Sequence, residues 1–206
     1  MIALLDWGVA SRALPGQPVS GDAHLVTQFP DGAVMAALDG LGHGPDAEAS
    51  SRAAVEAMSS NPKLPVEELV KNCHAALGRL RGVVMSLASF DAATSRMTWL
   101  GVGNVEGILV RALPGAGVVR ERLLLQGGIV GQTLPSIRPS TLKLSRNDVI
   151  AFATDGVDAA FLDTRLLEAI RDAAPPDTLA RYILETHSKG RDDALVLVAR
   201  YLGGGA

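Results

Sequence analysis

Acidic residues stand beside glycine, or beside a second acid, at four places where apolar segments of the chain begin or end. These residues are Asp22, Asp39, Asp155 and the pair Asp192 and Asp193. Each alone is typical of a cap or turn residue. Hardly any lysine or arginine in those segments neutralises them, and histidine and cysteine are too sparse there for a zinc site. Together they form the oxygen-rich ligand set that hard cations such as Mg²⁺ or Mn²⁺ prefer.

The stretch around Asp39 joins a predicted strand to a predicted helix. Residues 33–38 are a continuous apolar run of strand length, and residues 45–58 have helical apolar spacing. Asp39 therefore ends a buried strand, and the glycines that follow, beginning with Gly40, let the backbone turn tightly. Asp39-Gly40 alone favours a plain glycine-rich turn capped by an Asp. Together with the other acids, the stretch favours a metal site. The start of the helix that follows it would favour a phosphate at the same place.

The segment before this strand predicts a hairpin that brings two carboxylates together. Pro30 and Asp31 interrupt two strand-like runs and favour a two-residue turn. Cross-strand partners then have numbers summing to 61, which places Asp22 opposite Asp39. Directly opposed side chains lie about 4.5–5.5 Å apart at Cβ, so a divalent cation between them would convert repulsion into ligation.

The remaining pattern indicates an α+β protein in which antiparallel sheets are covered by helix pairs. A first strand is predicted at residues 2–9, and residues 126–136 form a longer loop that fits either a flap or an ordinary connection. Further helices are predicted at 65–81, 159–170 and 176–187, and further strands at 83–90, 97–102, 105–110, 118–125, 149–154 and 194–201.

Composition limits the classes of function. The 206 residues are 48% hydrophobic, which predicts one domain over residues 1–202 and a flexible tail at 203–206. The net charge is −3 and basic residues do not cluster, so no nucleic-acid partner is expected. No apolar run approaches the roughly 18 residues of a membrane span, and the first residues do not resemble a signal peptide. We expect a soluble, cytoplasmic monomer.

The side chains most often used as nucleophiles do not form a recognisable group. The single cysteine, Cys73, falls on the apolar side of a predicted helix, which favours a buried thiol over a nucleophile. His74 falls on the polar side of the same helix and is expected at the surface. No Ser-His-Asp arrangement can be recognised.

Five short segments together resemble the metal-dependent PP2C-type serine/threonine phosphatases, in the bacterial SpoIIE/RsbU/RsbX branch. They are Ser20-Gly21-Asp22, Asp39-Gly40-Leu41-Gly42-His43-Gly44, Gly101-Val102-Gly103-Asn104, Thr154-Asp155-Gly156 and Arg191-Asp192-Asp193, in the order of that family. The resemblance covers nearly the whole chain and is greatest to the RsbX-type stressosome phosphatases.

This resemblance implies a four-layer αββα sandwich with a two-metal centre holding Mn²⁺ or Mg²⁺. It implies that Asp39 bridges both ions and that the Gly40 carbonyl binds one of them. Asp155 and Asp192 would hold the second ion, and Asp22 would complete the first, partly through water. Asp193 is a weaker ligand candidate than Asp192.

The implied reaction is hydrolysis of phosphoserine or phosphothreonine by a metal-activated water. The implied partners are phosphorylated stressosome scaffold proteins with STAS domains, so the reaction would reset a stress-signalling pathway. Two alternatives stay open at this point. One is an RsbU/SpoIIE-like phosphatase of a phosphorylated anti-sigma antagonist, and the other is a non-catalytic adaptor with the PP2C fold.

Overall fold

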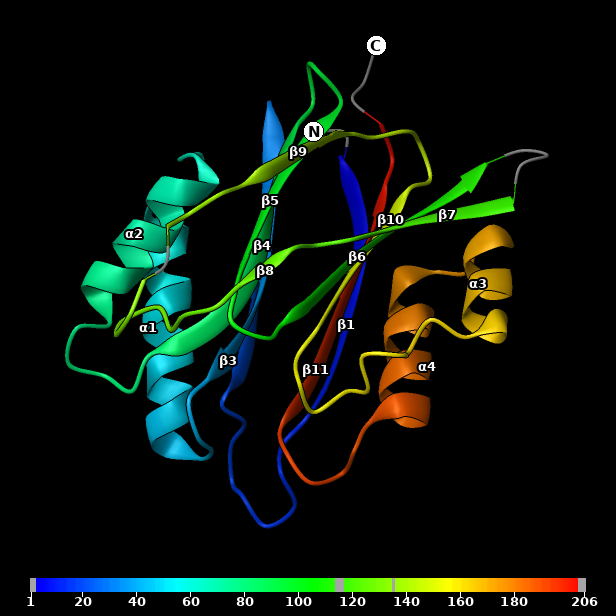
Figure 1. The fold of residues 1–206 in the computed structure, drawn as a ribbon. Coiled ribbons are helices and arrows are strands. Elements are labelled where there is room, and N and C mark those ends of the chain that lie inside the picture. The colour runs from blue at the N-terminus through cyan, green and yellow to red at the C-terminus, as the bar shows by residue number, and fades with distance from the viewer. Residues whose placement is uncertain (1–2, 114–116, 135, 204–206) are drawn as a thin grey trace.

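Two β-sheets pack face to face between two pairs of helices (Figure 1). The structure is a computed structural model that describes residues 3–113, 117–134 and 136–203. Most of the predicted tail, residues 204–206, therefore lies outside the described residues. The four-layer α+β arrangement expected from the sequence is confirmed.

The first sheet carries the predicted hairpin. Its strand order is β2-β3-β4-β5-β8, and β9 also pairs with β5. Every pair in this sheet is antiparallel except β5 with β8. The strand bounds are β2 Asp22–Phe29, β3 Gly32–Gly40, β4 Val83–Asp91, β5 Arg96–Val102, β8 Leu125–Gln126 and β9 Ser140–Lys143.

The second sheet is antiparallel and has the order β1-β11-β10-β6-β7. Its last strand in sequence, β11, lies between β1 and β10. The bounds are β1 Leu5–Arg12, β6 Glu106–Leu113, β7 Gly117–Arg122, β10 Val149–Ala153 and β11 Ala194–Tyr201.

The helices form the outer layers, with α1 and α2 over the first sheet and α3 and α4 over the second (Figure 1). Their bounds are α1 Pro45–Ser60, α2 Val66–Ala76, α3 Thr164–Arg171 and α4 Pro176–His187. Among the described residues, none of these helices is long and apolar enough to cross a bilayer.

Three apolar layers hold the sandwich together because each sheet is buried on both faces. Phe90, Trp99 and Phe152 lie between the two sheets. Met58 and Cys73 belong to the layer between the first sheet and its helices, which confirms the buried position predicted for the thiol. Such double-sided burial explains why β3, β10 and β11 are continuous apolar runs without alternation.

Several predicted element bounds are wrong, among them those of the first strand, α2 and α3. The first strand is shifted to Leu5–Arg12 because its register is set by pairing with β11. Helix α2 ends at Ala76, not Arg81, and the chain continues in turns over the next residues. Helix α3 begins only at Thr164, because the Asp163 carboxylate caps the helix by accepting the Leu166 N–H at 2.7 Å.

The segment after β8 is tied to the first sheet. Val130 is fully buried and exchanges two backbone hydrogen bonds of 2.9 Å with Val83. The neighbouring Gly131 N–H donates to Nδ1 of His74 at 3.0 Å. His74 is therefore half-buried and bonded, so its predicted place at the solvent surface is wrong.

Candidate metal centre

The hairpin between β2 and β3 brings Asp22 and Asp39 together. Phe29 pairs with Gly32, so Pro30 and Asp31 form the two-residue turn, and the ladder then pairs Asp22 directly with Asp39. The predicted register is confirmed. Because these residues end their strands, both carboxylates lie at the end of the first sheet that is opposite the turn.

Helix α1 packs very closely against the end of β3. A Cβ atom added to Gly40 would lie 2.3 Å from the Ala47 carbonyl oxygen, so only glycine permits this approach. The Gly40 N–H donates to the Gly21 carbonyl at 3.1 Å, and the buried Ser51 hydroxyl of α1 donates to the same carbonyl. Helix α1 thus fixes the backbone at Gly21, just before Asp22, and at Gly40, just after Asp39.

The second sheet supplies Asp155, which follows β10. Its Oδ2 accepts a hydrogen bond of 2.9 Å from Nδ2 of Asn104, a residue in the loop between β5 and β6. Its backbone carbonyl accepts from the Lys189 ammonium at 2.6 Å. Both the side chain and the main chain of Asp155 are therefore oriented by residues from other segments.

Asp192 and Asp193 precede β11 but have different surroundings. Asp193 is only 4% exposed, and its two carboxylate oxygens accept the Leu14 N–H at 2.6 Å and the Gly21 N–H at 2.7 Å. Asp192 is exposed and, among the described residues, accepts a hydrogen bond only from the Asp193 N–H, at 2.9 Å. Asp193 thus holds the loop before Asp22, whereas Asp192 keeps oxygen lone pairs for a ligand.

Thr154 connects the two sheets at this end. Its hydroxyl donates to Oδ2 of Asp22 at 2.7 Å and accepts the Leu195 N–H at 2.8 Å. Thr154 is 1% exposed, so water cannot replace either bond easily. The orientation of Asp22 is therefore set by the second sheet.

Two of these carboxylates, Asp22 and Asp39, have raised pKa values. Burial, with Asp39 next in size and then Asp193 and Asp155, raises the pKa of Asp22 to about 8, although the Thr154 hydrogen bond opposes the change. Burial, followed by the charges of Asp155, Asp192 and Asp193, raises the pKa of Asp39 to about 7. A cation placed among them would relieve both the desolvation and the mutual repulsion.

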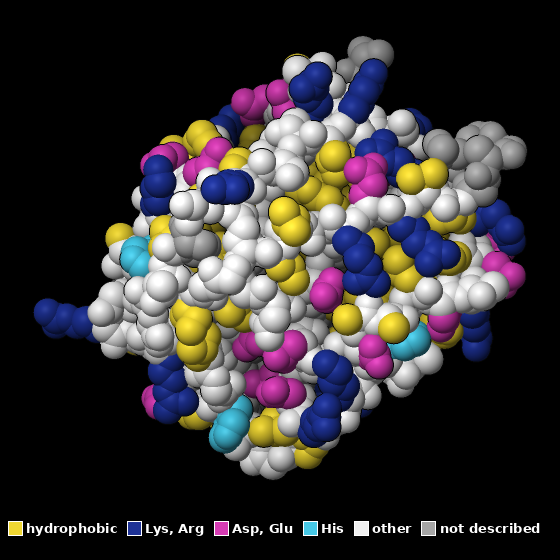
Figure 2. All heavy atoms as spheres, viewed as in Figure 1, with side chains coloured by type: hydrophobic (Ala, Val, Ile, Leu, Met, Phe, Trp, Pro, Cys, Tyr) yellow, Lys and Arg dark blue, Asp and Glu magenta, His cyan; other side chains and the backbone are white. Residues whose placement is uncertain are grey.

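A cavity of about 310 Å³ opens beside Asp39. Its polar lining includes Asp39, Asp155, Asp192, Asn104 and His43. Asp22 instead lines a separate cavity of about 440 Å³ between β2 and α1. Figure 2 shows acidic side chains gathered in a hollow at the lower end of the molecule, where β3 ends in the same view.

The donor set fits a hard divalent cation. It consists of carboxylates, a side-chain amide and backbone carbonyls, the oxygen ligands that Mg²⁺ and Mn²⁺ take together with several waters. Among the described residues no three Asp, Glu, His or Cys side chains already converge tightly enough to hold an ion by themselves. Water ligands and the Gly40 carbonyl would have to complete the coordination.

A family comparison agrees with this geometry. The model of the family described as Stage II sporulation protein E (SpoIIE) matches residues 30–202. The chain belongs to the SpoIIE family. The match includes Asp39, Asp155, Asp192 and Asp193, and Asp22 lies just before it.

Individual members and structures add detail. The phosphoserine phosphatase RsbX of Bacillus subtilis (strain 168) is 29% identical over 94 residues, which are 46% of this chain and 47% of RsbX. The chain thus matches about half the length of this curated relative. A chain solved in work on the bacterial stressosome as a modular system is 27% identical, with a TM-score of 0.85 over 95% of this chain and 99% of that one.

Two more distant structures share the fold. RsbX in complex with magnesium has a TM-score of 0.82 at 20% identity, covering 96% of this chain and 95% of the other. The catalytic domain of the serine/threonine phosphatase PstP with two manganese ions has a TM-score of 0.66 at 15% identity, covering 96% and 98%. The SpoIIE-family chain described here therefore has the PP2C fold.

The structure brings Asp39, Asp155 and Asp192 to one cavity. Asp22 pairs with Asp39 across the ladder but lines a separate cavity, and the carboxylate of Asp193 accepts backbone N–H groups. Sequence reasoning missed Thr154, Asn104 and Ser51 as supports of these acids. Thr154 and Asn104 lie inside two of the segments that resemble the family, next to Asp155 and after Gly103. Their place in these segments was the one signal that could have identified them. Ser51 gave no signal beyond its place on the buried side of α1.

Proposed function

We propose that this SpoIIE-family chain is a metal-dependent protein phosphatase that hydrolyses phosphoserine or phosphothreonine. The observation that carries the proposal is the convergence of carboxylates from both sheets on one open cavity, with Asp39 from the first sheet and Asp155 and Asp192 from the second. RsbX, which this chain matches over about half of its length, is a phosphoserine phosphatase, and its activity supports the same reaction.

Residues 1–202 would form one phosphatase domain that holds two divalent cations, Mn²⁺ or Mg²⁺. Asp39 would bind both ions and the Gly40 carbonyl one of them. Asp155 and Asp192 would hold the second ion, and Asp22 would complete the first, partly through water. When bound, such a pair lowers the pKa of water towards neutrality and neutralises charge on phosphoryl oxygens. The magnesium and manganese complexes of RsbX and PstP support this choice of ions.

The protein residues act by positioning. Asn104 orients Asp155, Thr154 orients Asp22, and Asp193 fixes the loop that carries Asp22. No covalent nucleophile is needed, and Cys73 is unsuited to that role because burial raises the pKa of its thiol to about 12.

We further propose that the substrates are phosphorylated STAS-domain proteins of a stressosome, that the enzyme is a monomer and that it works in the cytoplasm. The stressosome structure with a TM-score of 0.85 supports this class of partner. A phosphorylated anti-sigma antagonist is the competing substrate, and phosphate release from each phosphoprotein separates the two.

The test is phosphate release from each phosphoprotein, with Mn²⁺, with Mg²⁺ and with excess EDTA. The parent should release phosphate only with metal, whereas Asp39→Asn should lose at least about 100-fold in kcat because it cannot draw two cations together. Asp177→Asn is the matched control, since Asp177 is exposed on α4 and, in the part of the chain that the structure describes, forms an ion pair only with Arg181. Full turnover in EDTA would exclude the metal-dependent reaction, and binding without any phosphate release would favour an adaptor.

A further inference from the structure

One side of the metal-centre cavity is apolar. Leu41, Val84 and Ile129 line the cavity together with the acids, and all three side chains are half-buried. They come from three segments, since Leu41 follows β3, Val84 belongs to β4 and Ile129 lies between β8 and β9. We call these three side chains the apolar wall. Because Val84 pairs directly with Asp39 in the β3–β4 ladder, the wall begins beside the carboxylate that is proposed to bind both ions.

Gly82 brings the members of the apolar wall together. Its carbonyl accepts the Leu41 N–H at 3.1 Å. A Cβ atom added to Gly82 would lie 2.8 Å from both Cγ2 of Ile129 and the Val130 carbonyl oxygen, and its φ of 86° is one that side chains disfavour. The glycine therefore lets the segment that carries Ile129 approach the start of β4.

The segment that carries Ile129 is fixed on two sides. Ile129 and Thr133 exchange backbone hydrogen bonds of 2.8 and 2.9 Å, which close residues 129–133 into a tight loop. Val130 is paired with β4, and the Gly131 N–H donates to Nδ1 of His74 on α2. Ile129 therefore cannot move away from the cavity as part of this loop without breaking bonds to β4 and to α2.

An apolar wall beside gathered acids selects a ligand whose two ends differ. Half-buried aliphatic side chains in an open cavity gain free energy when an apolar group covers them. The acids, with their cations, would hold a phosphoryl group, so the wall would contact what lies next to that group. Hydroxyls of a phosphosugar would lose hydrogen bonds to water there, whereas an aliphatic side chain would not.

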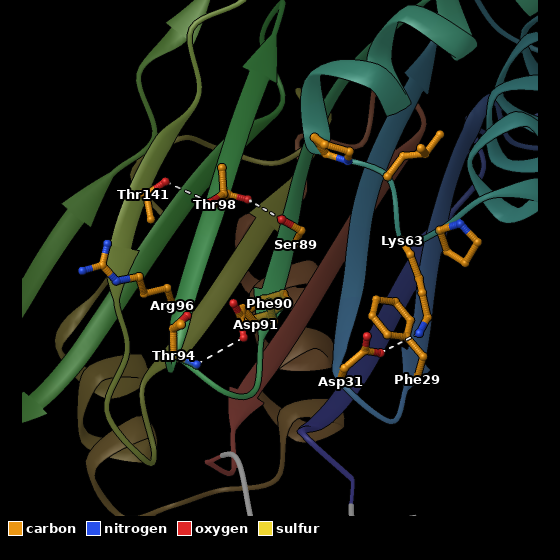
Figure 3. Close-up of a pocket in the computed structure, with 13 residues that line it drawn as sticks. Phe29, Asp31, Lys63, Ser89, Phe90, Asp91, Thr94, Arg96, Thr98 and Thr141 are labelled. Atoms are coloured by element: carbon orange, nitrogen blue, oxygen red, sulfur yellow. Dashed lines mark hydrogen bonds and ion pairs between the residues drawn. The ribbon is translucent and has the colours of Figure 1, made fainter.

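A groove near the β2–β3 turn lacks this combination. It has a volume of about 330 Å³ and lies at the opposite end of β3 from Asp39 (Figure 3). Its charges balance, because Asp31 pairs with Lys63 at 2.7 Å and Asp91 lies opposite Arg96 in the β4–β5 register. The metal-centre cavity instead places three carboxylates beside three aliphatic side chains.

We propose that the apolar wall binds an aliphatic side chain next to the phosphoserine or phosphothreonine of the substrate, and that His74 positions the wall through Gly131. The inference rests on the proposed phosphatase function and narrows its substrate class to phosphorylated segments with an aliphatic neighbour such as leucine. Ile129 is then a specificity residue that touches the substrate. His74 is a positioning residue that acts through the loop.

The first test compares two phosphopeptides that differ only beside the phosphoserine, with leucine on both sides in one and serine in the other. With Mn²⁺, the parent should have about tenfold higher kcat/KM for the leucine peptide, mainly through a lower KM. In Ile129→Ala this preference should fall to about threefold, because most of one wall side chain is removed. Leu124→Ala is the matched control and should keep the preference, since Leu124 is 78% exposed and does not line the cavity.

The second test concerns His74. His74→Phe keeps a ring but cannot accept the Gly131 N–H, whereas His74→Asn retains an acceptor oxygen. In EDTA the Gly131 amide hydrogen should exchange at least about tenfold faster in the Phe variant than in the parent. The Phe variant should also lose most of the preference for the leucine peptide, and the Asn variant should restore both properties. A role in folding alone would lower the thermal midpoint without changing the ratio between the two peptides.

Failure of this inference and failure of the phosphatase proposal give different results. Equal kcat/KM for the two peptides in the parent, or an unchanged preference in a folded Ile129→Ala protein, would overturn the apolar wall and leave the phosphatase in place. Thermal unfolding checks the fold of each variant, and the milder Ile129→Val should give an intermediate ratio.

Binding of fluorescein-labelled peptides, followed by fluorescence anisotropy, decides the case of a parent that hydrolyses neither peptide. That result would overturn the phosphatase proposal. Tighter binding of the leucine phosphopeptide than of the serine one would still support the wall, and equal binding would overturn it. The unphosphorylated leucine peptide should bind at least about tenfold more weakly than its phosphorylated form. Equal binding of these two would also overturn the inference, because it would indicate a general apolar site.

Discussion

Asp22 and Asp39 face each other across the β2–β3 ladder, and among the described residues neither carboxylate forms an ion pair with a basic side chain. Burial, followed by the charges of the neighbouring acids, raises the pKa of each well above its ordinary value. Repulsion between the acids therefore destabilises the metal-free protein at this end of the sheets, and replacing one acid with a neutral residue should remove part of that repulsion.

The first prediction concerns stability without metal. Asp39→Asn keeps the shape of the side chain but removes one of the repelling charges. At pH 8 in EDTA, urea unfolding should give this variant a free energy of unfolding equal to or greater than that of the parent. Added Mn²⁺ should raise the thermal midpoint of the parent clearly and that of the variant very little. A variant that is less stable than the parent in EDTA would mean that the acids do not repel each other.

The second prediction concerns Thr154. Thr154→Val keeps the shape but leaves the buried Leu195 N–H without its acceptor and Asp22 without its donor, which should cost about 1–3 kcal/mol of unfolding free energy. The Mn²⁺ concentration for half-maximal activity should also rise. Thr154→Ser retains the hydroxyl and should restore the metal response. An unchanged Mn²⁺ requirement in the Val variant would separate Thr154 from the centre.

The third prediction concerns the thiol. Cys73 is fully buried and its Sγ–H donates to the Ala54 carbonyl at 3.4 Å. Because burial raises the pKa of the thiol to about 12, it should stay protonated at pH 8 and react with a disulfide reagent only after unfolding. Cys73→Ala should keep most of the phosphatase activity. Loss of all activity in a folded Cys73→Ala protein would indicate thiol chemistry.

The fourth prediction concerns acid stability through Asp163. Partial burial raises its pKa, but hydrogen bonds from the Leu166 N–H, the Tyr182 hydroxyl and His187 outweigh burial and hold the pKa below its ordinary value. A depressed pKa stabilises the fold above the unfolded-state value, and this stabilisation is lost as pH falls through the folded-state pKa.

Urea unfolding at neutral and acidic pH checks this prediction. Asp163→Ala should lose about 1 kcal/mol at pH 7, the usual contribution of an N-cap. Its deficit relative to the parent should shrink as the pH falls below about 4, the ordinary aspartate value. A deficit that is constant with pH would show that the charge of Asp163 is not involved.

The elements that sequence predicted best are those whose cause is local. Pro30 and Asp31 fixed the turn and therefore the Asp22–Asp39 register, and Pro176 set the start of α4. The bonds around the acids escaped prediction because they join distant segments. Thr154 and Asp22 are 132 residues apart, and Asp193 and Leu14 are 179 apart, so no local pattern records either contact.

The place of β11 in the second sheet affects the order in which the protein can assemble during synthesis. β1 emerges from the ribosome before the other strands of the two sheets, yet its ladder partner among the described residues is β11, the last of these strands to be made. The same late segment carries Asp192, and it carries Asp193, which anchors the loop before Asp22. A growing chain would therefore leave β1 unpaired and the acid centre incomplete until β11 has been added, so a chain stopped before residue 190 should bind no metal there.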